Sequence, residues 1–355
     1  MKTDFLIVGQ GLAGSLLAWH LLGAGRRVLV VDRDEESTSS KVAAGLVTPL
    51  AGSRFHLPEH LGERLDYARR FYWDIEERSG QTLFRHLRIA RLFRDQSEAD
   101  LWRSRIAREP ERYARYHAPL EVDPGSLHMP FGGFEMREGG WLDVPAFLEV
   151  TRQALLERAA YAIAKVRSED ISASPGGVRW KNVEAGWAVF CEGWRGAANR
   201  FFDWVPLRPT CGGILDLRLP RLAGEGRILN RGGWLLPLGD GRFRAGSTYR
   251  ELLPSHAAAG EIADADADRD EILAKVAAIT PAAAEVVGQR TGLRPTIRRS
   301  QIFMGPHPAH PRIVFFNGFG SKGVLNGPWH AATLVAHLLV GAPLPESAEL
   351  GGRFL

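Results

Sequence analysis

The chain has 355 residues, 45% of them hydrophobic and 24% charged, a composition typical of a soluble globular protein with one large or two modest domains. Its net charge is only +4, from 45 basic and 41 acidic residues, and no block of five like charges occurs. A charged nucleic-acid-binding tail is therefore not expected. The sequence pI of about 9.2 is nevertheless compatible with a diffuse basic surface.

The first elements are an apolar strand and a glycine-rich turn at residues 5–14, FLIVGQGLAG. A helix, a second apolar strand at residues 28–31 and the carboxylate of Asp32 follow within one short unit. This order predicts a dinucleotide-binding βαβ unit whose helix N-terminus faces the pyrophosphate. Asp32 is placed to accept hydrogen bonds from ribose hydroxyls.

Each glycine of this turn has its own expected role. Gly9 permits the tight turn, Gly11 lets the backbone approach the pyrophosphate, and Gly14 lets the helix pack closely on the strand. Residues 5–24 are also apolar enough to resemble a signal peptide, but four glycines interrupt the run. We expect neither a signal peptide nor a membrane span, and a cytoplasmic protein.

Hydrophobic periodicity and turn residues predict the remaining elements. The helices are expected at residues 62–80, 96–108, 143–158, around 272–279, and at 324–340. Asp143 is the expected N-cap of the third of these helices, with Pro145 in its first turn. Short strands are expected at residues 87–93, 162–166, 177–180, 188–191, 214–219, 233–236, 242–246 and 312–316.

The last strand leads into a second glycine-rich turn, GFGSKG at residues 318–323, which precedes the last helix. A helix N-terminus here would present backbone N–H groups and partial positive charge to an electron-rich ligand. The first unit alone does not distinguish FAD from NAD. Two helix N-termini from opposite ends of the chain around one extended ligand favour FAD.

The chain also carries residues that suggest other chemistry at first sight. Cys191 and Cys211 are too far apart for a C-x-x-C redox or zinc pattern. His56 and His60 have the spacing of a helical metal pair, but Pro58 between them argues against a helix. We therefore expect no metal site.

The two glycine turns and several weaker motifs together resemble FAD-dependent amine and amino-acid oxidoreductases of the D-amino-acid oxidase superfamily, including glycine oxidase and sarcosine oxidase. The matching segments, which span nearly the whole chain, are residues 9–14 with Asp32, 43–46, 140–143, 190–193, 237–248, 292–295 and 318–323. The second glycine turn is also similar to the oxidase domain of the bifunctional enzyme that modifies the tRNA wobble uridine.

The resemblance implies an α/β fold, with a Rossmann-like FAD-binding domain of the glutathione-reductase type and an inserted antiparallel-sheet (α+β) substrate domain. The discontinuous FAD-binding domain is expected at residues 1–85, 145–205 and 290–355, and the substrate domain at residues 86–144 and 206–289. Parallel-type elements at both ends of the chain and antiparallel material in its middle are consistent with this division.

Several residues are implied in cofactor binding. Residues 43–46 would lie along the flavin, Val166 near the adenine, and residues 320–324 over the pyrimidine edge of the flavin. The helix dipole there would stabilise negative charge on the reduced ring. The full set is Gly9, Gly11, Leu12, Ala13, Gly14, Asp32, Arg33, Lys41, Ala43, Ala44, Gly45, Leu46, Val166, Cys191, Glu192, Gly193, Arg294, Gly318, Gly320, Ser321, Lys322, Gly323 and Val324.

Arg294 matches the arginine with which the family holds a substrate carboxylate, and a planar guanidinium suits bidentate carboxylate binding. Trp234, Tyr249 and Arg298 are further candidates for the substrate pocket. The sequence departs from the family at Trp234, where glycine oxidase has a tyrosine, and at Ser321, where it has a second arginine. Arg299 and Ile302 replace a family aspartate and proline. These departures leave the substrate unnamed.

The implied reaction is oxidation of a C–N bond by hydride transfer to N5 of a non-covalently bound FAD, followed by hydrolysis of the imine. The substrate would be a small amine or amino acid, and oxygen or an electron carrier would reoxidise the flavin. The alternative is an RNA-directed flavoenzyme that acts on a modified-uridine amine in tRNA. An NAD-linked dehydrogenase and an FAD monooxygenase are weaker alternatives.

Overall fold

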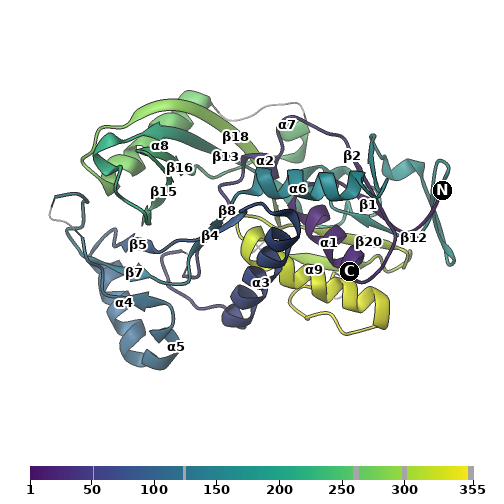
Figure 1. The fold of residues 1–355 in the computed structure, drawn as a ribbon, viewed down its shortest axis with the longest axis horizontal. Helices are drawn as coiled ribbons and strands as arrows, with labels where there is room; N and C mark the ends of the chain where they lie inside the picture. Colours follow the sequence, from purple (N-terminus) through teal and green to yellow (C-terminus); the bar gives the residue numbers. More distant parts are fainter. Residues whose placement is uncertain (51, 123–124, 259–263, 298–301, 351–355) are drawn as a thin grey trace.

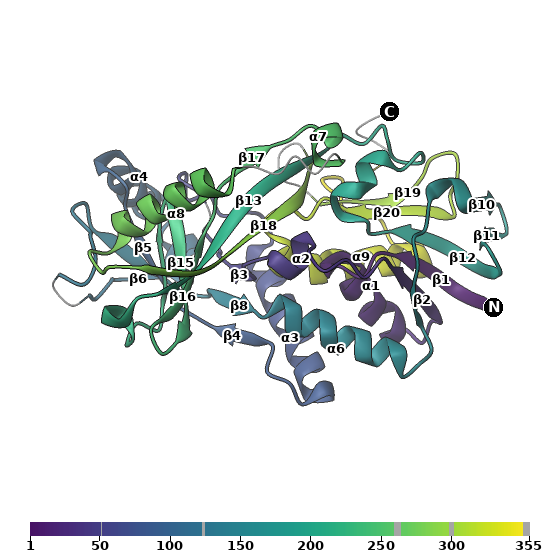
Figure 2. The ribbon, with the colours of Figure 1, turned by 90° about the horizontal axis from the view of Figure 1, so that it is seen from above.

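The computed structural model describes residues 1–50, 52–122, 125–258, 264–297 and 302–350. Two large sheets lie toward opposite ends of the long axis of the molecule, and helices α1, α3, α6 and α9 lie around the sheet that contains the N-terminal strand (Figure 1). The long strands β13 and β18 extend from the other sheet toward the centre of the molecule (Figure 2).

An eight-stranded, mainly parallel sheet has the order β10-β11-β12-β1-β2-β9, with β20 beside β12 and β19 beside β20. Its strands are β1 (Lys2–Val8), β2 (Val28–Asp32), β9 (Tyr161–Ile163), β10 (Ile171–Ser174), β11 (Gly177–Trp180), β12 (Val183–Phe190), β19 (Phe303–Pro306) and β20 (Ile313–Asn317). The strands β9, β2, β1, β12 and β20 run parallel to one another. Leu6, Ile7 and Val30 are fully buried, because a parallel sheet is covered on both faces.

Four helices form one hydrophobic core with the face of this sheet that carries Phe5 and Ile7. They are α1 (Leu12–Gly23), α3 (Leu61–Ser79), α6 (Val144–Leu156) and α9 (Gly323–Val340). Within this group α1 packs against α6 and α9, and α3 packs against α9. Asp143 caps α6 as predicted, since its Oδ1 accepts a hydrogen bond from the Ala146 N–H at 3.2 Å.

A nine-stranded sheet has the order β17-β13-β16-β15-β14-β5-β7-β6, with β18 also paired to β13. Its strands are β5 (Ile89–Leu92), β6 (His117–Ala118), β7 (Gly133–Met136), β13 (Leu207–Arg218), β14 (Ile228–Arg231), β15 (Gly233–Gly239), β16 (Arg242–Gly246), β17 (Arg250–Glu251) and β18 (Glu285–Ile297). The pairs are antiparallel except β5–β14, which is parallel. The expected antiparallel sheet is therefore mixed, because β5 joins it from an earlier part of the chain.

One further helix covers the second sheet, and short elements complete the fold. Helix α8 (Ala265–Ile279) packs through Ile272 and Val276 into the core formed by the sheet. The other elements are α2 (Ser39–Val42), α4 (Gln96–Arg108), α5 (Pro110–Ala114), α7 (Pro254–Ala258), η1 (Ser168–Asp170), η2 (Gly193–Ala198), η3 (Pro220–Leu222), and a small sheet of β3 (Leu46–Val47), β8 (Gly140–Leu142) and β4 (Phe84–His86).

The helices predicted at residues 62–80, 96–108 and 324–340 are present as α3, α4 and α9. The two sheets are consistent with the two-domain division expected from the sequence, which stays a prediction; its boundary at residue 290 lies within β18. Among the helices of the described residues, none has the length and apolar character needed to cross a membrane.

Candidate functional site

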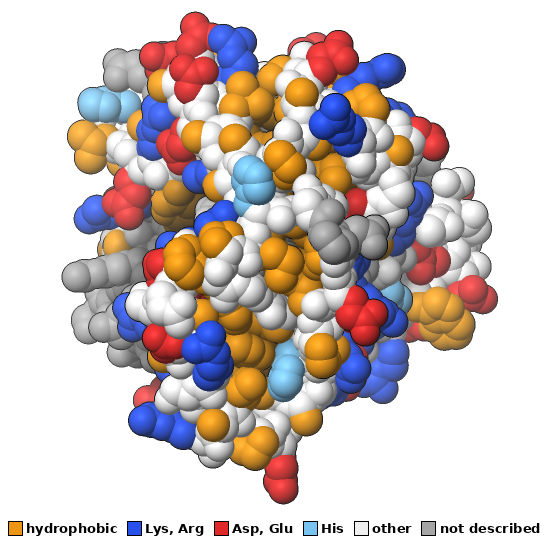
Figure 3. Space-filling model, turned by 90° about the vertical axis from the view of Figure 1, so that its left-hand side faces the viewer, with side chains coloured by type: hydrophobic (Ala, Val, Ile, Leu, Met, Phe, Trp, Pro, Cys, Tyr) orange, Lys and Arg blue, Asp and Glu red, His pale blue; other side chains and the backbone are white. Residues whose placement is uncertain are grey.

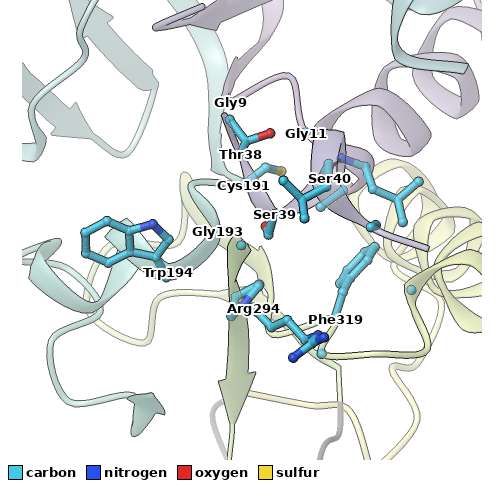
Figure 4. A pocket seen from close by; sticks show the side chains of 18 of the residues that line it. Gly9, Gly11, Thr38, Ser39, Ser40, Cys191, Gly193, Trp194, Arg294 and Phe319 are labelled. Carbon is cyan, nitrogen blue, oxygen red and sulfur yellow. Dashed lines mark hydrogen bonds between the residues drawn. The ribbon is translucent and has the colours of Figure 1, made fainter. Parts of the chain in front are cut away.

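A cavity of about 320 Å³ lies between the two sheets and is lined by residues from both. One end is formed by the turn after β1 and by the end of β2, and the other by residues of β13, β15 and β18. The N-terminal residues of both α1 and α9 line its wall. Gly9 and Gly11 lie at one end of the view in Figure 4, and Arg294 and Phe319 at the other.

Two glycines at and after the turn that follows β1 have no room for a side chain. Gly9 has a φ of +102°, and a Cβ atom at Gly14 would lie 1.9 Å from the Gly9 carbonyl oxygen. Gly11 is the N-cap of α1 and has no side chain to bond the first N–H groups of the helix. The first N–H of the helix, that of Leu12, is bonded by Ser40 Oγ, and the positive end of the helix dipole at this end of the cavity suits an anionic group such as a phosphate.

Asp32 is fixed by backbone donors from two segments. Its Oδ2 accepts from the Gln10 N–H at 2.6 Å, and its Oδ1 accepts from the Asp34 N–H at 2.7 Å. Arg152 of α6 supports both segments, because Nε donates to Gln10 Oε1 at 3.0 Å and Nη1 donates to Asp34 Oδ1 at 2.7 Å. Each carboxylate oxygen of Asp32 has a second lone pair, so the group can still accept from ribose hydroxyls.

A run of four hydroxyl side chains, Ser37, Thr38, Ser39 and Ser40, lines the cavity beside this turn. Ser40 Oγ accepts a hydrogen bond from the Leu12 N–H at 3.0 Å, so α2 contacts the N-terminus of α1 directly. Sequence reasoning did not assign these residues to the site. The serine and threonine residues ahead of Lys41 could have indicated the N-cap of a helix, which Thr38 forms. They could not have indicated that Ser40 contacts α1.

Another part of the cavity wall also depends on a glycine that packs directly against the backbone. Gly45 has a φ of +74°, and a Cβ atom there would lie 2.0 Å from the Leu142 carbonyl oxygen. The chain around Gly45 therefore packs tightly on β8 and presents Ala43, Ala44 and Leu46 to the cavity. Because Ala43 and Ala44 have small side chains, a ligand ring could approach the backbone closely here.

The N-terminus of α9 forms the facing wall, where Gly323 and Val324 line the cavity. Asn317, at the end of β20, connects this wall to the segment after β12, because its Nδ2 donates to the Gly193 carbonyl oxygen at 2.7 Å. Lys322 is the N-cap residue of α9 and does not line the cavity. Burial lowers the pKa of the Lys322 ammonium below its usual range.

Arg294 lies at the far end of the cavity and extends across the backbone of β13. A Cβ atom at Gly212 would lie 2.1 Å from Arg294 Nη1, so the guanidinium is packed directly against that glycine. Nη1 donates to the Thr248 carbonyl oxygen at 3.3 Å, and the ring of Tyr249 lies 5.7 Å from the guanidinium carbon. No ion pair to Arg294 is found within the described residues. Burial lowers the pKa of this guanidinium.

Trp234 lies in the same way over Gly246, where a Cβ atom would be 2.5 Å from the indole Cζ2. The indole therefore covers bare backbone and forms part of the cavity wall. Tyr249 is 52% exposed and contacts Arg294 without lining the cavity. Arg298 and Arg299 lie outside the described residues, and Ile302 is buried.

The cavity brings together most of the residues singled out from the sequence. Those that line it are Gly9, Gly11, Leu12, Ala13, Asp32, Arg33, Ala43, Ala44, Gly45, Leu46, Val166, Cys191, Glu192, Gly193, Trp234, Arg294, Gly320, Ser321, Gly323 and Val324. Those that do not are Gly14, Lys41, Gly318, Lys322 and Tyr249. Lys41 instead donates from Nζ to the Glu35 carbonyl oxygen. Besides the hydroxyl run, sequence reasoning missed Glu35, Trp194, Arg195, Gly212, Ile214, Asn230, Ser247, Asn317 and Phe319.

The residues present fit FAD. The cavity is lined by a carboxylate and the N-terminus of α1, by the small side chains of Ala43 and Ala44, and by the N-terminus of α9. This donor set matches a ribose, a pyrophosphate and an electron-poor ring along one molecule. Glu192 also lines the cavity, and burial raises the pKa of its carboxyl group.

Comparison with known proteins agrees with this geometry. Residues 4–338 match the family model described as FAD dependent oxidoreductase. Glycine oxidase of Pseudomonas putida is 24% identical over 380 residues, 98% of this chain and 99% of that protein. The tRNA 5-methylaminomethyl-2-thiouridine biosynthesis bifunctional protein MnmC of Acinetobacter baylyi is 23% identical over 371 residues, 98% of this chain. The chain spans about half the length of that bifunctional relative, 55%.

Solved structures share the fold at low sequence identity. Iminodiacetate oxidase from Chelativorans sp. BNC1 superposes with a TM-score of 0.81 at 18% identity, covering 98% of this chain and 99% of that one. Glycine oxidase from Geobacillus kaustophilus gives a TM-score of 0.76 at 18% identity, covering 97% and 96%. The predicted α/β fold is confirmed by this likeness. With a family match over nearly its whole length, the chain is an enzyme that belongs to the FAD-dependent oxidoreductases of the D-amino-acid oxidase superfamily.

Proposed function

We propose that this enzyme binds FAD non-covalently and oxidises a C–N bond of a small amine or amino acid. The observation that carries the proposal is Arg294, a guanidinium that lines the cavity over Gly212 and forms no direct ion pair with a described residue. A substrate carboxylate would supply the missing countercharge, with the planar fork of the guanidinium fixing its orientation.

The bound FAD would supply a hydride acceptor at its N5 atom. The protein would hold the substrate carboxylate through Arg294, while Trp234 would exclude water from the reacting carbon. Loss of the C–H electron pair as hydride from a neutral amine would convert the C–N bond to a protonated imine, and water would hydrolyse this to a carbonyl compound and a protonated amine. A neutral substrate amine makes a general base unnecessary.

Non-covalent binding is consistent with the state of the cysteines. Cys191 lines the cavity and is buried, and burial raises the pKa of its thiol, so the reactive thiolate is disfavoured. Cys211 is also buried. Acid precipitation of the purified enzyme is expected to release all the flavin into the supernatant. The proposal includes oxygen or an electron carrier as the acceptor and a cytoplasmic location.

The test is anaerobic mixing of the holoenzyme with a panel of amino acids and secondary amines, with flavin absorbance as the signal. We expect bleaching by at least one carboxylate-bearing amine. Arg294→Lys keeps the positive charge but loses the planar pair of N–H donors that binds a carboxylate through both oxygens. This variant is expected to raise the apparent Kd for the substrate more than it lowers the limiting rate of flavin reduction. A panel in which no amine bleaches the flavin would contradict the proposal.

A second candidate is a modified-uridine amine in tRNA, because relatives involved in tRNA 5-methylaminomethyl-2-thiouridine biosynthesis match 98% of this chain. On the face of the molecule shown in Figure 3, basic and acidic side chains are interspersed around a central band of hydrophobic ones. Phosphate-backbone binding favours a continuous basic surface, so this face does not favour tRNA. Binding of unmodified tRNA that weakens steeply with salt would support the second candidate.

A further inference from the structure

Asn230 of β14 lines the same cavity as Arg294, although nothing in its local sequence marks it as a site residue. It lies directly across from Trp234 on β15 and from Arg91 on β5. Residues directly opposite on neighbouring strands point to the same face of a sheet. The side chains of Trp234, Asn230 and Arg91 therefore lie next to one another on the same face of the sheet, with Asn230 in the middle.

The orientation of the Asn230 amide is determined by its neighbour. Arg91 Nη1 donates to Asn230 Oδ1, and a guanidinium has donors only, so the atom that faces Arg91 must be the amide oxygen. The Nδ2 group then faces away from Arg91 and makes no hydrogen bond within the part of the chain that the structure describes. Its two N–H donors are free for a ligand in the cavity.

A buried ion pair holds Arg91 in place. Arg91 and Glu98 are 5% and 3% exposed, and Arg91 Nη2 donates to Glu98 Oε1. The other oxygen, Glu98 Oε2, accepts from the Arg94 N–H at 2.7 Å. If Glu98 turned away, the buried guanidinium of Arg91 would lose its acidic partner, which is strongly unfavourable. The amide of Asn230 is thus preorganised at the cavity wall.

Asn230 and Arg294 approach the cavity from well-separated strands. The Arg294 guanidinium lies over Gly212 of β13, and Asn230 lies on β14, with β16 and β15 between them. Three strand spacings amount to about 14 Å between the two backbones. The two side chains shorten this span, but a group bonded to both must still be longer than glycine.

We propose that Asn230 donates a hydrogen bond from Nδ2 to an oxygen acceptor on the substrate, at the end remote from the carboxylate that Arg294 would bind. This inference deepens the proposed function and rests on it. The substrate class it names is an N-substituted amino acid whose N-substituent carries a carboxylate or carbonyl oxygen. Asn230 would then discriminate between N-substituents of similar length, while Arg294 would recognise the carboxylate common to all of them.

The test uses two ethers that contain no amine and cannot be oxidised, (3-carboxypropoxy)acetate and pentoxyacetate. They have similar length, but only the first has an acceptor at its remote end. Binding to the oxidised holoenzyme is measured from the perturbation of the flavin spectrum. We expect the wild-type enzyme to bind the dicarboxylate at least about tenfold more tightly, the usual value of a hydrogen bond to a charged group.

The decisive variant is Asn230→Asp, which keeps an oxygen toward Arg91 and replaces the cavity-facing donor by an anionic acceptor. We expect it to abolish or reverse the preference for the dicarboxylate, with a much smaller change in the Kd for pentoxyacetate, whose only charge is remote from Asn230, and with an unchanged or higher Tm. Asn182→Asp, the same exchange at an exposed turn, is the matched control and should keep the preference.

Three results would overturn the inference: no preference in the wild-type enzyme, an equal preference in Asn230→Asp, or a changed flavin spectrum in Asn230→Asp without ligand, which would make Asn230 a cofactor contact. The amine panel is scored separately. If no amine bleaches the flavin but the ether preference depends on Asn230, the proposed reaction is wrong and the binding role of Asn230 stands.

Discussion

The hydroxyl of Tyr72, on α3, donates a hydrogen bond of 2.9 Å to the carbonyl oxygen of Val324, in the first turn of α9. In a regular helix that carbonyl would accept from the N–H of residue 328, four positions later. Residue 328 is Pro328, which has no N–H to donate. A fully buried tyrosine from a distant helix therefore replaces the missing helix bond beside the cavity.

Removal of this hydroxyl should destabilise the protein. Tyr72→Phe leaves the Val324 carbonyl unpaired in the core, and we expect a loss of about 1–3 kcal/mol in the free energy of unfolding. Chemical denaturation measures this loss. Because Val324 lines the cavity, the bound flavin per chain should fall as well.

A double-mutant cycle separates the hydrogen bond from other effects of the change. Pro328→Ala restores the N–H of residue 328, so Tyr72→Phe should cost about 1 kcal/mol less in a Pro328→Ala background than in the wild-type chain. Equal costs in both backgrounds would mean that the tyrosine does not substitute for the helix bond.

The glycine turn after β1 offers a test with a control in the same helix. A Cβ atom at Gly14 would lie 1.9 Å from the Gly9 carbonyl oxygen, whereas a Cβ atom at Gly23 would meet no atom within 4 Å. Gly14→Ala should separate α1 from the turn and strongly reduce the flavin content of the purified protein. Gly23→Ala should keep the flavin and raise stability by about 0.5 kcal/mol, since alanine favours helix. Flavin absorbance and Tm are the measurements.

Local signals made the cofactor end of the molecule predictable. The strand, the glycine turn and the helix that follow one another from β1 to α1 are contiguous, and so are β20 and α9 at the other end of the chain. The steric demands on Gly9 and Gly14 depend on neighbours within the same unit or on the strand beside it. Sequence alone therefore located both helix N-termini that line the cavity.

Residues that distant contacts bring to the cavity, or to the residues that line it, were not predictable. Asn230 belongs to the site because β14 pairs with β5, which lies well over a hundred residues earlier in the chain, in a parallel register that short strands do not reveal. Tyr72 is 252 residues from its acceptor. Ser40 lies in the short helix α2, within a segment whose polar composition predicts a solvent-exposed loop. Each depends on tertiary geometry that no local pattern encodes.

The position of Arg294 depends on the absence of a side chain at Gly212. A Cβ atom there would lie 2.1 Å from Nη1 and would displace the guanidinium from the backbone of β13. Gly212→Ala is therefore expected to weaken binding of the best carboxylate ligand by about tenfold or more, with the flavin content retained. Equilibrium titration of the flavin spectrum checks this.

The matched control is Gly224→Ala, since a Cβ atom at Gly224 would meet no atom within 4 Å. This variant should bind the ligand as the wild-type enzyme does. Unchanged binding in Gly212→Ala would show that the guanidinium has other positions equally suited to the carboxylate, and the steric account of Arg294 would then be wrong.

Two histidines, the half-buried His20 and the buried His330, should make the protein sensitive to acid. Burial lowers the pKa of both His20 and His330 from 6.5 to about 4. His330 lies in α9 and donates from Nδ1 to the Asn326 carbonyl oxygen at 2.7 Å. Between pH 6.5 and about 4 the unfolded chain binds protons at these sites that the folded chain does not. The free energy of unfolding should therefore be fully maintained above pH 6.5 and should fall as the pH is lowered through that window.

His330→Gln tests this linkage, because glutamine can donate a similar hydrogen bond and does not titrate. Within the window each histidine contributes up to about 1.4 kcal/mol per pH unit to the slope of the free energy of unfolding against pH. The slope of the variant between pH 6 and pH 4.5 should therefore be smaller than that of the wild-type protein by up to this amount. Urea denaturation at several pH values measures the slope. A slope identical to that of the wild-type protein would mean that His330 is protonated in the folded state, and the neutral, buried state inferred from its surroundings would then be wrong.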